Sequence, residues 1–271
     1  MNAVVTELVP ILGEPELTRL RHARKLLENP GIAAQLANVV GAPMEYVMAR
    51  RLPASVTRLI NTATRRSLEQ SLRVATATLR RGELHAPART RTHAWMAAAT
   101  GAAGGAFGLA GLAVELPVTT TMILRSIADI ARSHGEDLDD PAATLACFEV
   151  LTMGGRSASD DGTESGYFAA RAVLAQQVAA AAEYIAVHGG VNNTGPAIVQ
   201  LLASVGSRFS VNVSQKVAAQ AVPIIGAVSG ATLNTLFMRH FQKMAEGHFI
   251  VRALERSHGA IAVREAYDAL V

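Results

Sequence analysis

The chain has 271 residues and a formal net charge of +3, which is enough length for one or two domains with a substantial core. Hydrophobic residues make up 50% of the sequence, but only 4% is aromatic and 17% charged, so Ala, Val, Leu and Ile supply most of the apolar bulk. With a mean hydropathy of +0.24, this composition excludes a disordered chain, a collagen-like repeat and a disulfide-rich scaffold. It is typical of an unusually apolar helical protein or of one that contacts a membrane.

The cysteine content and the first residues indicate where the protein is located. Cys147 is the only cysteine, so no disulfide can form within the chain and nothing requires an oxidising compartment. The start, MNAVVTELVPILGEPEL, lacks the positive region of a secretory signal and reaches Glu7 before any sustained apolar run. We therefore expect a cytoplasmic protein.

Helical periodicity begins near the start of the sequence. Residues 14–29 place leucines at helical spacing between Pro15 and the breaker Asn29-Pro30-Gly31, and a second short helix is expected at about 31–40. Residues 55–81 follow with apolar positions on one helical face. The opposite face of this helix carries a stripe of arginines, namely Arg58, Arg65, Arg73 and Arg80.

The arginine stripe belongs to a strongly basic segment, in which ten arginines stand against two glutamates between Arg50 and Arg91. Such a stripe fits anionic lipid headgroups on the inner face of a membrane, and it also fits plain exposure to solvent. Nucleic acid is not the expected partner, because the segment has no aromatic side chains for base stacking and no recognised binding motif. The stripe is therefore a candidate membrane surface, with a solvated helix face as the alternative.

Two long uncharged stretches follow, Ala94–Val114 and Val217–Met238. The first is long enough to span a membrane, but it is rich in Gly and Ala, which favour insertion weakly, so a closely packed helix facing protein explains it as well. Glu115 and Pro117 are expected to end it, with a new helix over Val118–His134 and Gly135 just beyond its end.

The remaining elements are also expected to be helical. Asp140-Pro141 resembles an N-cap and a first helical residue, and the last long helix should end at His258-Gly259. Between them helices are expected at Ala142–Met153, Tyr167–His188, Pro196–Gly206 and Arg208–Ala221. No stretch alternates with a period of two for long enough to predict a sheet.

The predicted fold class is therefore all-α. We expect one domain over residues 1–271, with a basic amphipathic helical part at 1–92 and an apolar helical core at 93–271. Within this helical bundle, the two apolar helices rich in Gly and Ala should pack closely through their small residues.

Four long segments carry a resemblance to a known family: LLENPGIAAQLAN, TGAAGGAFGLAGLAVELPVTTTMILRSIADIARSHGEDL, SDDGTESGYFAARAVLA and VPIIGAVSGATLNTLFMRHFQKMAEGHFIVRALE. From about Leu17 to Gly259, the chain resembles the bacterial EcsC protein family. The family's namesake accompanies the two components of an ABC transporter in a bacterial operon, and no reaction is securely assigned to the family. The resemblance thus implies a bacterial intracellular protein near the membrane and names no catalytic residue.

Glu115 is the first candidate site residue, because it is the only charged residue between His93 and Arg125. A carboxylate desolvated there would have a raised pKa and could donate a proton or anchor a polar ligand. The alternative is a glutamate at a helix end, satisfied by backbone amides or by Thr119 to Thr121.

The last long helix carries the second group of candidates on one side, namely His240, Met244, His248 and Glu255. This spacing could gather soft metal ligands, but it is common on helices without metals, so a ligand-binding or hydrogen-bonded core face is favoured and no metal or cofactor is predicted. Neither a nucleophile elbow nor a phosphate-binding loop is present in the sequence.

The expected function is non-enzymatic. We expect a cytoplasmic protein, peripheral at the inner face of the membrane, that binds a lipid or another apolar ligand or contacts an ABC-type transporter. The alternative is a hydrolase, with or without a metal ion, that uses the polar groups around Glu115, His240 and His248.

Overall fold

The computed structural model of this chain describes residues 12–28, 32, 35–36, 52–78, 84–105, 108–153, 166–188, 195–220 and 230–270. All regular secondary structure in these ranges is helical, which confirms the predicted all-α class. In chain order the helices are α1 (Glu14–Leu27), α4 (Ala54–Thr78), α5 (Thr90–Gly105), α6 (Gly108–Ser133), α7 (Pro141–Glu149), the 3-10 turn η1 (Val150–Thr152), α8 (Gly166–His188), α9 (Pro196–Gln220), α10 (Gly230–His258) and α11 (Ala260–Ala269).

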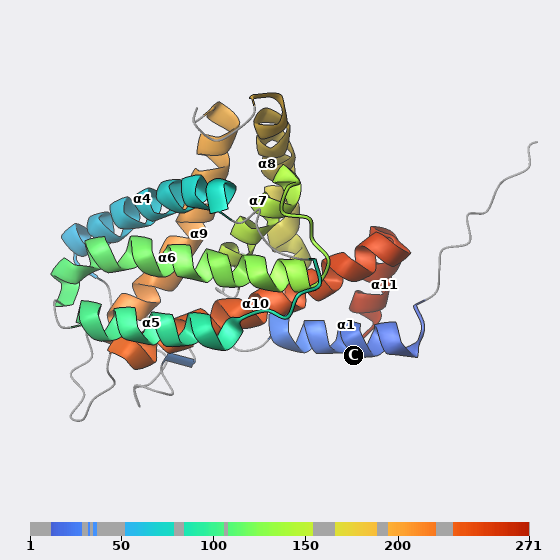
Figure 1. The fold of residues 1–271 in the computed structure, drawn as a ribbon, viewed down its shortest axis with the longest axis horizontal. Coiled ribbons are helices and arrows are strands. Elements are labelled where there is room, and N and C mark those ends of the chain that lie inside the picture. Colours follow the sequence, from blue (N-terminus) through green and yellow to red (C-terminus); the bar gives the residue numbers. More distant parts are fainter. Residues whose placement is uncertain are drawn as a thin grey trace, which may run out of the picture.

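Helices α4, α6 and α5 lie one beside the next, and α10 runs along α5 and α6 (Figure 1). Helix α9 crosses this group and packs against α4, while α7 and α8 form a pair at one end. The longest helix, α10, has 29 residues and packs against α1, α5, α6, α9 and α11. It therefore joins helices from the beginning, the middle and the end of the chain.

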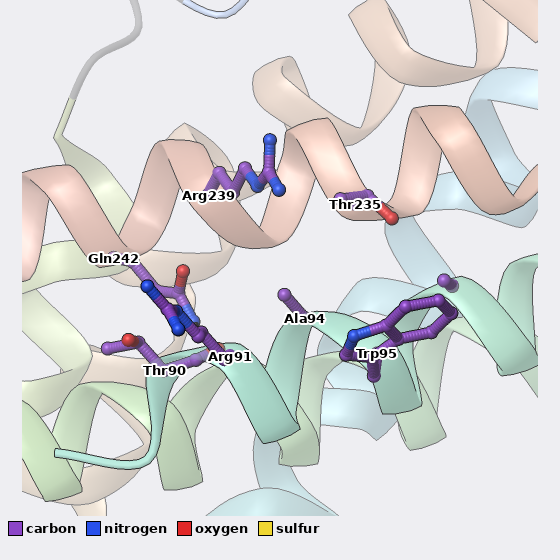
Figure 2. Close-up of a pocket in the computed structure, with 8 residues that line it drawn as sticks. Thr90, Arg91, Ala94, Trp95, Thr235, Arg239 and Gln242 are labelled. Carbon is purple, nitrogen blue, oxygen red and sulfur yellow. Dashed lines mark hydrogen bonds between the residues drawn. The ribbon is translucent and has the colours of Figure 1, made fainter.

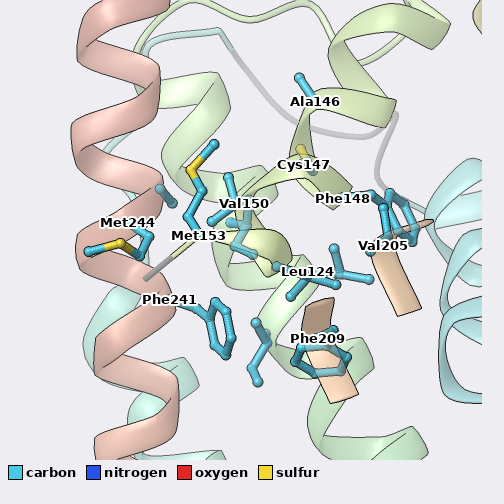
Figure 3. Packing of buried hydrophobic residues seen from close by; sticks show 14 of the residues in the cluster. Leu124, Ala146, Cys147, Phe148, Val150, Met153, Val205, Phe209, Phe241 and Met244 are labelled. Atoms are coloured by element: carbon cyan, nitrogen blue, oxygen red, sulfur yellow. The ribbon is translucent and has the colours of Figure 1, made fainter. Parts of the chain in front are cut away.

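The core between these helices is built from aliphatic and aromatic side chains that the helical periodicity places inward. Figure 3 shows Leu124 of α6, Phe148 of α7, Phe209 of α9 and Phe241 and Met244 of α10 as members of one cluster. The Phe209 and Phe241 rings pack edge to face with centroids 5.7 Å apart. Such aromatic pairs add about 0.5–1.5 kcal/mol to the stability that area burial provides.

The expected close packing through small residues is confirmed where α5 meets the start of α10. A Cβ atom added to Gly101 would lie 2.3 Å from the carbonyl oxygen of Gly230 and 2.8 Å from Cβ of Asn234. The two backbones therefore touch directly, which only a residue without a side chain allows at position 101.

One expectation about helix boundaries is wrong. Glu115 and Pro117 do not end a helix, because α6 runs without interruption from Gly108 to Ser133 with Pro117 inside it. An interior proline costs about 3 kcal/mol. Burial of Leu116 on one side of it and Ile123 on the other is worth about 1.5–3 kcal/mol for each side chain, which offsets that cost.

Other boundaries also differ from expectation. The uncharged stretch 94–114 is shared between α5 and α6, and the helices expected at Pro196–Gly206 and Arg208–Ala221 form the single helix α9. Helix α11 was not expected. None of the described helices combines the length and the hydropathy needed to cross a bilayer.

Several helix ends follow the sequence signals. Asp140 caps α7 by accepting a hydrogen bond from the Ala142 amide at 2.9 Å, and Pro141 is the first helical residue. Gly135 and Gly259 have φ angles of +80° and +84°, the left-handed conformation expected just after α6 and α10. Of the helix expected at 31–40, residues 32, 35 and 36 are helical, and the others lie outside the described residues.

Candidate functional site

Glu115 is buried in the first third of α6 and is paired with a lysine. The ammonium group of Lys216 on α9 donates a hydrogen bond to Glu115 Oε1 at 2.7 Å. Lys216 is 1% exposed and Glu115 7% exposed. The candidate carboxylate is thus neither at a helix end nor open to a ligand, since its charge is balanced by a buried cation.

The surroundings of this pair are apolar on one side. The Lys216 ammonium lies 5.4 Å from the centre of the Phe237 ring, a cation–π contact. Burial lowers the pKa of Lys216, and the Glu115 carboxylate opposes that shift by stabilising the ammonium. The Glu115 carboxylate therefore favours the charged form of Lys216, which burial alone disfavours.

Two buried side-chain oxygen atoms without hydrogen-bond partners among the described residues lie near the pair on the same helices. In the described part of the chain, Thr119 Oγ1 on α6 and Asn212 Oδ1 on α9 are buried and accept or donate no hydrogen bond. Each is one helical turn away from Glu115 or Lys216. The interior between α6 and α9 is therefore polar over more than the ion pair alone.

His240 and Met244 lie inside the core. Burial lowers the pKa of His240 to about 4, so its imidazole is neutral at physiological pH. Its ring packs edge to face against Phe241, and Met244 belongs to the cluster in Figure 3. These two residues therefore pack together with apolar neighbours.

His248 lies farther along α10, in a different environment. Its Nδ1 is 3.0 Å from the Tyr167 hydroxyl, and Arg171 donates to the same hydroxyl oxygen at 3.3 Å. The direction of the Tyr167–His248 bond follows the tautomer of the ring: the hydroxyl donates to Nδ1 when the ring hydrogen is on Nε2, and accepts when it is on Nδ1. Nε2 points toward the buried Glu149 carboxylate at 3.7 Å, which is too long for a hydrogen bond.

The pKa values around His248 are governed by burial. Burial lowers the pKa of His248 well below its usual value, and the nearby Arg171 and Arg252 lower it further. Burial also raises the pKa of Glu149, which Arg171 and Arg252 oppose. His248 is therefore a neutral hydrogen-bonding group between α7, α8 and α10.

Glu255 completes this network through a two-point ion pair with Arg171 of α8, at 2.8 and 3.0 Å. One turn earlier, Arg252 makes an equivalent pair with the buried Glu136 at 2.9 and 3.0 Å, and Arg256 contacts the same carboxylate. These bonds join the last turns of α10 to α8 and to the loop after α6. Two-point arginine–carboxylate pairs fix orientation as well as distance.

The candidate residues thus fall into separate surroundings. Glu115 pairs with Lys216, His240 and Met244 lie in the apolar core, and His248 and Glu255 share the Tyr167 and Arg171 network. Among the described residues, no group of three His, Cys, Asp or Glu side chains is placed to hold a metal ion.

Sequence reasoning missed Lys216, Tyr167, Arg171 and Glu149 as members of these sites. A signal for Lys216 was present, because it is the only charged residue between Arg208 and Arg239, just as Glu115 is alone between His93 and Arg125. Two lone charges of opposite sign in two apolar stretches predict a buried pair. No comparable signal exists for Tyr167, whose contact with His248 joins residues 81 positions apart.

The arginine stripe of α4 lies on the surface. Arg58, Arg65 and Arg73 are exposed, and so is Arg66, while Arg80 lies outside the described residues. The opposite face of α4 is buried against α6 and α9 through Ile60, Leu68 and Leu72. Helix α4 is therefore amphipathic as its sequence predicts, with the arginines in solvent and the apolar side chains in the core.

These observations define the class as an all-helical protein with ion pairs buried between its helices and a basic outer helix. Comparison with protein-family models matches residues 15–254 to the EcsC protein family, and the chain belongs to that family. Searches of curated proteins and of solved structures returned no match.

Proposed function

We propose that this protein binds the surface of an anionic membrane through α4 and acts there without catalysing a reaction. The observation that carries the proposal is the exposed basic face of α4. Arg58, Arg65, Arg66 and Arg73 are exposed along this helix, and its one acidic residue, Glu69, pairs with Arg65 at 3.6 Å.

The geometry of α4 supports contact with a flat surface. With 25 residues the helix is about 37 Å long, so the arginines are spread along one edge of the molecule. Each arginine near an anionic lipid surface contributes about 1 kcal/mol, and two to four of them together give reversible binding. The buried face of α4 holds the helix in place while its arginines meet the headgroups.

Membership in the EcsC family supports the same location, since the family's namesake accompanies an ABC transporter. A protein at the inner face of the membrane is positioned to contact such a transporter or to bind its lipid surroundings. The separate surroundings of Glu115, His240 and His248 give no reason to prefer a hydrolase.

Flotation with lipid vesicles tests the proposal. The protein should float with vesicles containing phosphatidylglycerol and stay behind with vesicles of phosphatidylcholine alone, and added salt should weaken the binding. The variant Arg58→Gln/Arg65→Gln/Arg73→Gln should lose most of this binding.

A matched control is Arg19→Gln/Arg21→Gln/Arg125→Gln, which removes the same charge from exposed positions on α1 and α6. It should float like the parent protein. Equal binding to neutral and anionic vesicles, or an equal loss in both triple variants, would refute a role for the α4 face.

A further inference from the structure

An open groove lies between α5 and α10, with a volume of about 480 Å³. Figure 2 shows Arg91, Ala94 and Trp95 on α5 and Arg239 and Thr235 on the neighbouring α10. One end of the groove is fixed by Gln242, whose amide donates to the Thr90 carbonyl at 2.8 Å and to Ser126 Oγ at 2.9 Å. The groove walls are therefore held by packed helices and by hydrogen bonds between them.

The charges of the groove are of one sign. Arg91 and Arg239 are exposed, and within the described part of the chain neither makes an ion pair. No acidic residue lines the groove in this part of the structure. Two guanidinium groups without a carboxylate partner on facing helices favour a bound anion.

The groove also offers an apolar surface. Trp95 is 79% exposed, and Ala94 and Ala98 lie beside it on the same helix. The flat faces of an indole ring stack on planar or apolar groups of ligands. The groove thus combines two positive charges with one aromatic face.

Its position separates it from the proposed membrane face. Helix α6 packs against α4 on one side and against α5 and α10 on the other, so it lies between the α4 arginines and the groove (Figure 1). When α4 lies on a membrane, the groove is on the far side of α6. Its occupant is then a soluble molecule.

We propose that the groove between α5 and α10 binds a soluble phosphate ester with a planar apolar body. The phosphate contacts Arg91 and Arg239, and the body lies against Trp95. A phosphate monoester carries between one and two negative charges at neutral pH, which matches two guanidinium groups, whereas a carboxylate would neutralise one. Arginine also binds phosphate through two parallel hydrogen bonds.

Trp95 is the only tryptophan of the chain, so intrinsic tryptophan fluorescence reports on this groove alone. Titration of the full-length protein with phenyl phosphate should change the Trp95 emission saturably, and inorganic phosphate should compete. Arg91→Gln and Arg239→Gln should each weaken the binding about tenfold or more, because each removes charged hydrogen bonds.

The variant Arg58→Gln/Arg65→Gln/Arg73→Gln is the matched control. It should bind phenyl phosphate like the parent protein while losing vesicle binding, whereas Arg91→Gln/Arg239→Gln should keep vesicle binding and lose phenyl phosphate. Failure of the groove proposal and failure of the membrane proposal are thus distinguished by separate variants and separate probes.

Two results would overturn the proposal. One is a Trp95 emission that phenyl phosphate leaves unchanged, or changes equally in Arg91→Gln/Arg239→Gln. The other is an emission change with phosphatidylglycerol vesicles that requires Arg91 and Arg239, which would make the occupant a lipid headgroup. Circular dichroism of each variant would show that the helices remain folded.

Discussion

Lys216 Nζ of α9 and Glu115 Oε1 of α6 lie 2.7 Å apart in the interior, each residue being the only charge in a long apolar stretch of sequence. Both side chains are almost completely buried. A buried pair of this kind costs desolvation energy that the mutual attraction repays only when both members are present.

Replacing one member of the pair should therefore lower the free energy of unfolding much more than replacing both members. Glu115→Gln leaves an unpaired buried ammonium group and should lower the free energy of unfolding by about 3–5 kcal/mol. The double variant Glu115→Leu/Lys216→Met replaces the pair with apolar side chains and should stay within about 1 kcal/mol of the parent or exceed it. Urea unfolding measures both, and a double variant as unstable as Glu115→Gln would contradict the pairing.

The contact between Gly101 and Gly230 predicts a sharp difference between two glycine replacements. Gly101→Ala forces α5 and α10 apart and should cost about 1–3 kcal/mol or more, because the new Cβ meets backbone. Gly206→Ala in α9 places its Cβ 3.5 Å from Leu68 Cδ1, an ordinary contact, and should gain up to about 1 kcal/mol of helix propensity. Thermal melts that rank the two variants in the reverse order would rule out the close approach.

The buried neutral His240 predicts a loss of stability in acid. Its pKa is about 4 in the folded protein and 6.5 when unfolded, so below pH 6.5 the unfolded chain binds a proton that the folded chain does not. Stability should fall as the pH drops from 6.5 to 4, by about 3 kcal/mol from this residue.

His240→Leu should make the pH dependence of unfolding flatter over that interval. Urea midpoints measured at pH 7, 5.5 and 4 test this prediction. An equal fall of the midpoint with pH in His240→Leu and in the parent protein would refute the role of His240.

The hydrogen bond between Tyr167 and His248 predicts that two Tyr→Phe variants differ in stability. Tyr167→Phe removes the hydrogen-bond partner of His248 Nδ1 and leaves a buried imidazole nitrogen unpaired, which should cost about 1–3 kcal/mol. Tyr184→Phe should cost almost nothing, because the Tyr184 hydroxyl makes no hydrogen bond in the described part of the chain. Equal stability of the two variants in urea would show that the Tyr167 bond contributes nothing.

The helical class and several helix ends could be predicted because their causes are local. Asp140 caps α7 through an amide two residues away, and Gly135 and Gly259 adopt conformations that favour glycine. The continuation of α6 through Pro117 could not be predicted, because burial of Leu116 and Ile123 against other helices outweighs the local cost of proline.

The sites were harder to predict than the helices. Glu115 stood out in the sequence because it is the only charge in an apolar stretch, but its partner is 101 positions away on a helix whose packing the periodicity does not specify. The groove at Trp95 has the same difficulty, since residues of two helices far apart in the sequence line it. Spacing along one helix shows which residues share a face, and it does not show what that face meets.

The packing of α1 on α10 has a consequence for synthesis on the ribosome. Gly247 of α10 leaves room for Leu27, and the Arg24 side chain donates to the carbonyl of Tyr267 on the adjoining α11, 243 positions later. At roughly 5–20 residues per second, α1 emerges tens of seconds before the helix that covers its apolar face. Throughout that time Leu20 and Ala23, which are fully buried in the folded protein, are exposed and can bind chaperones or neighbouring nascent chains.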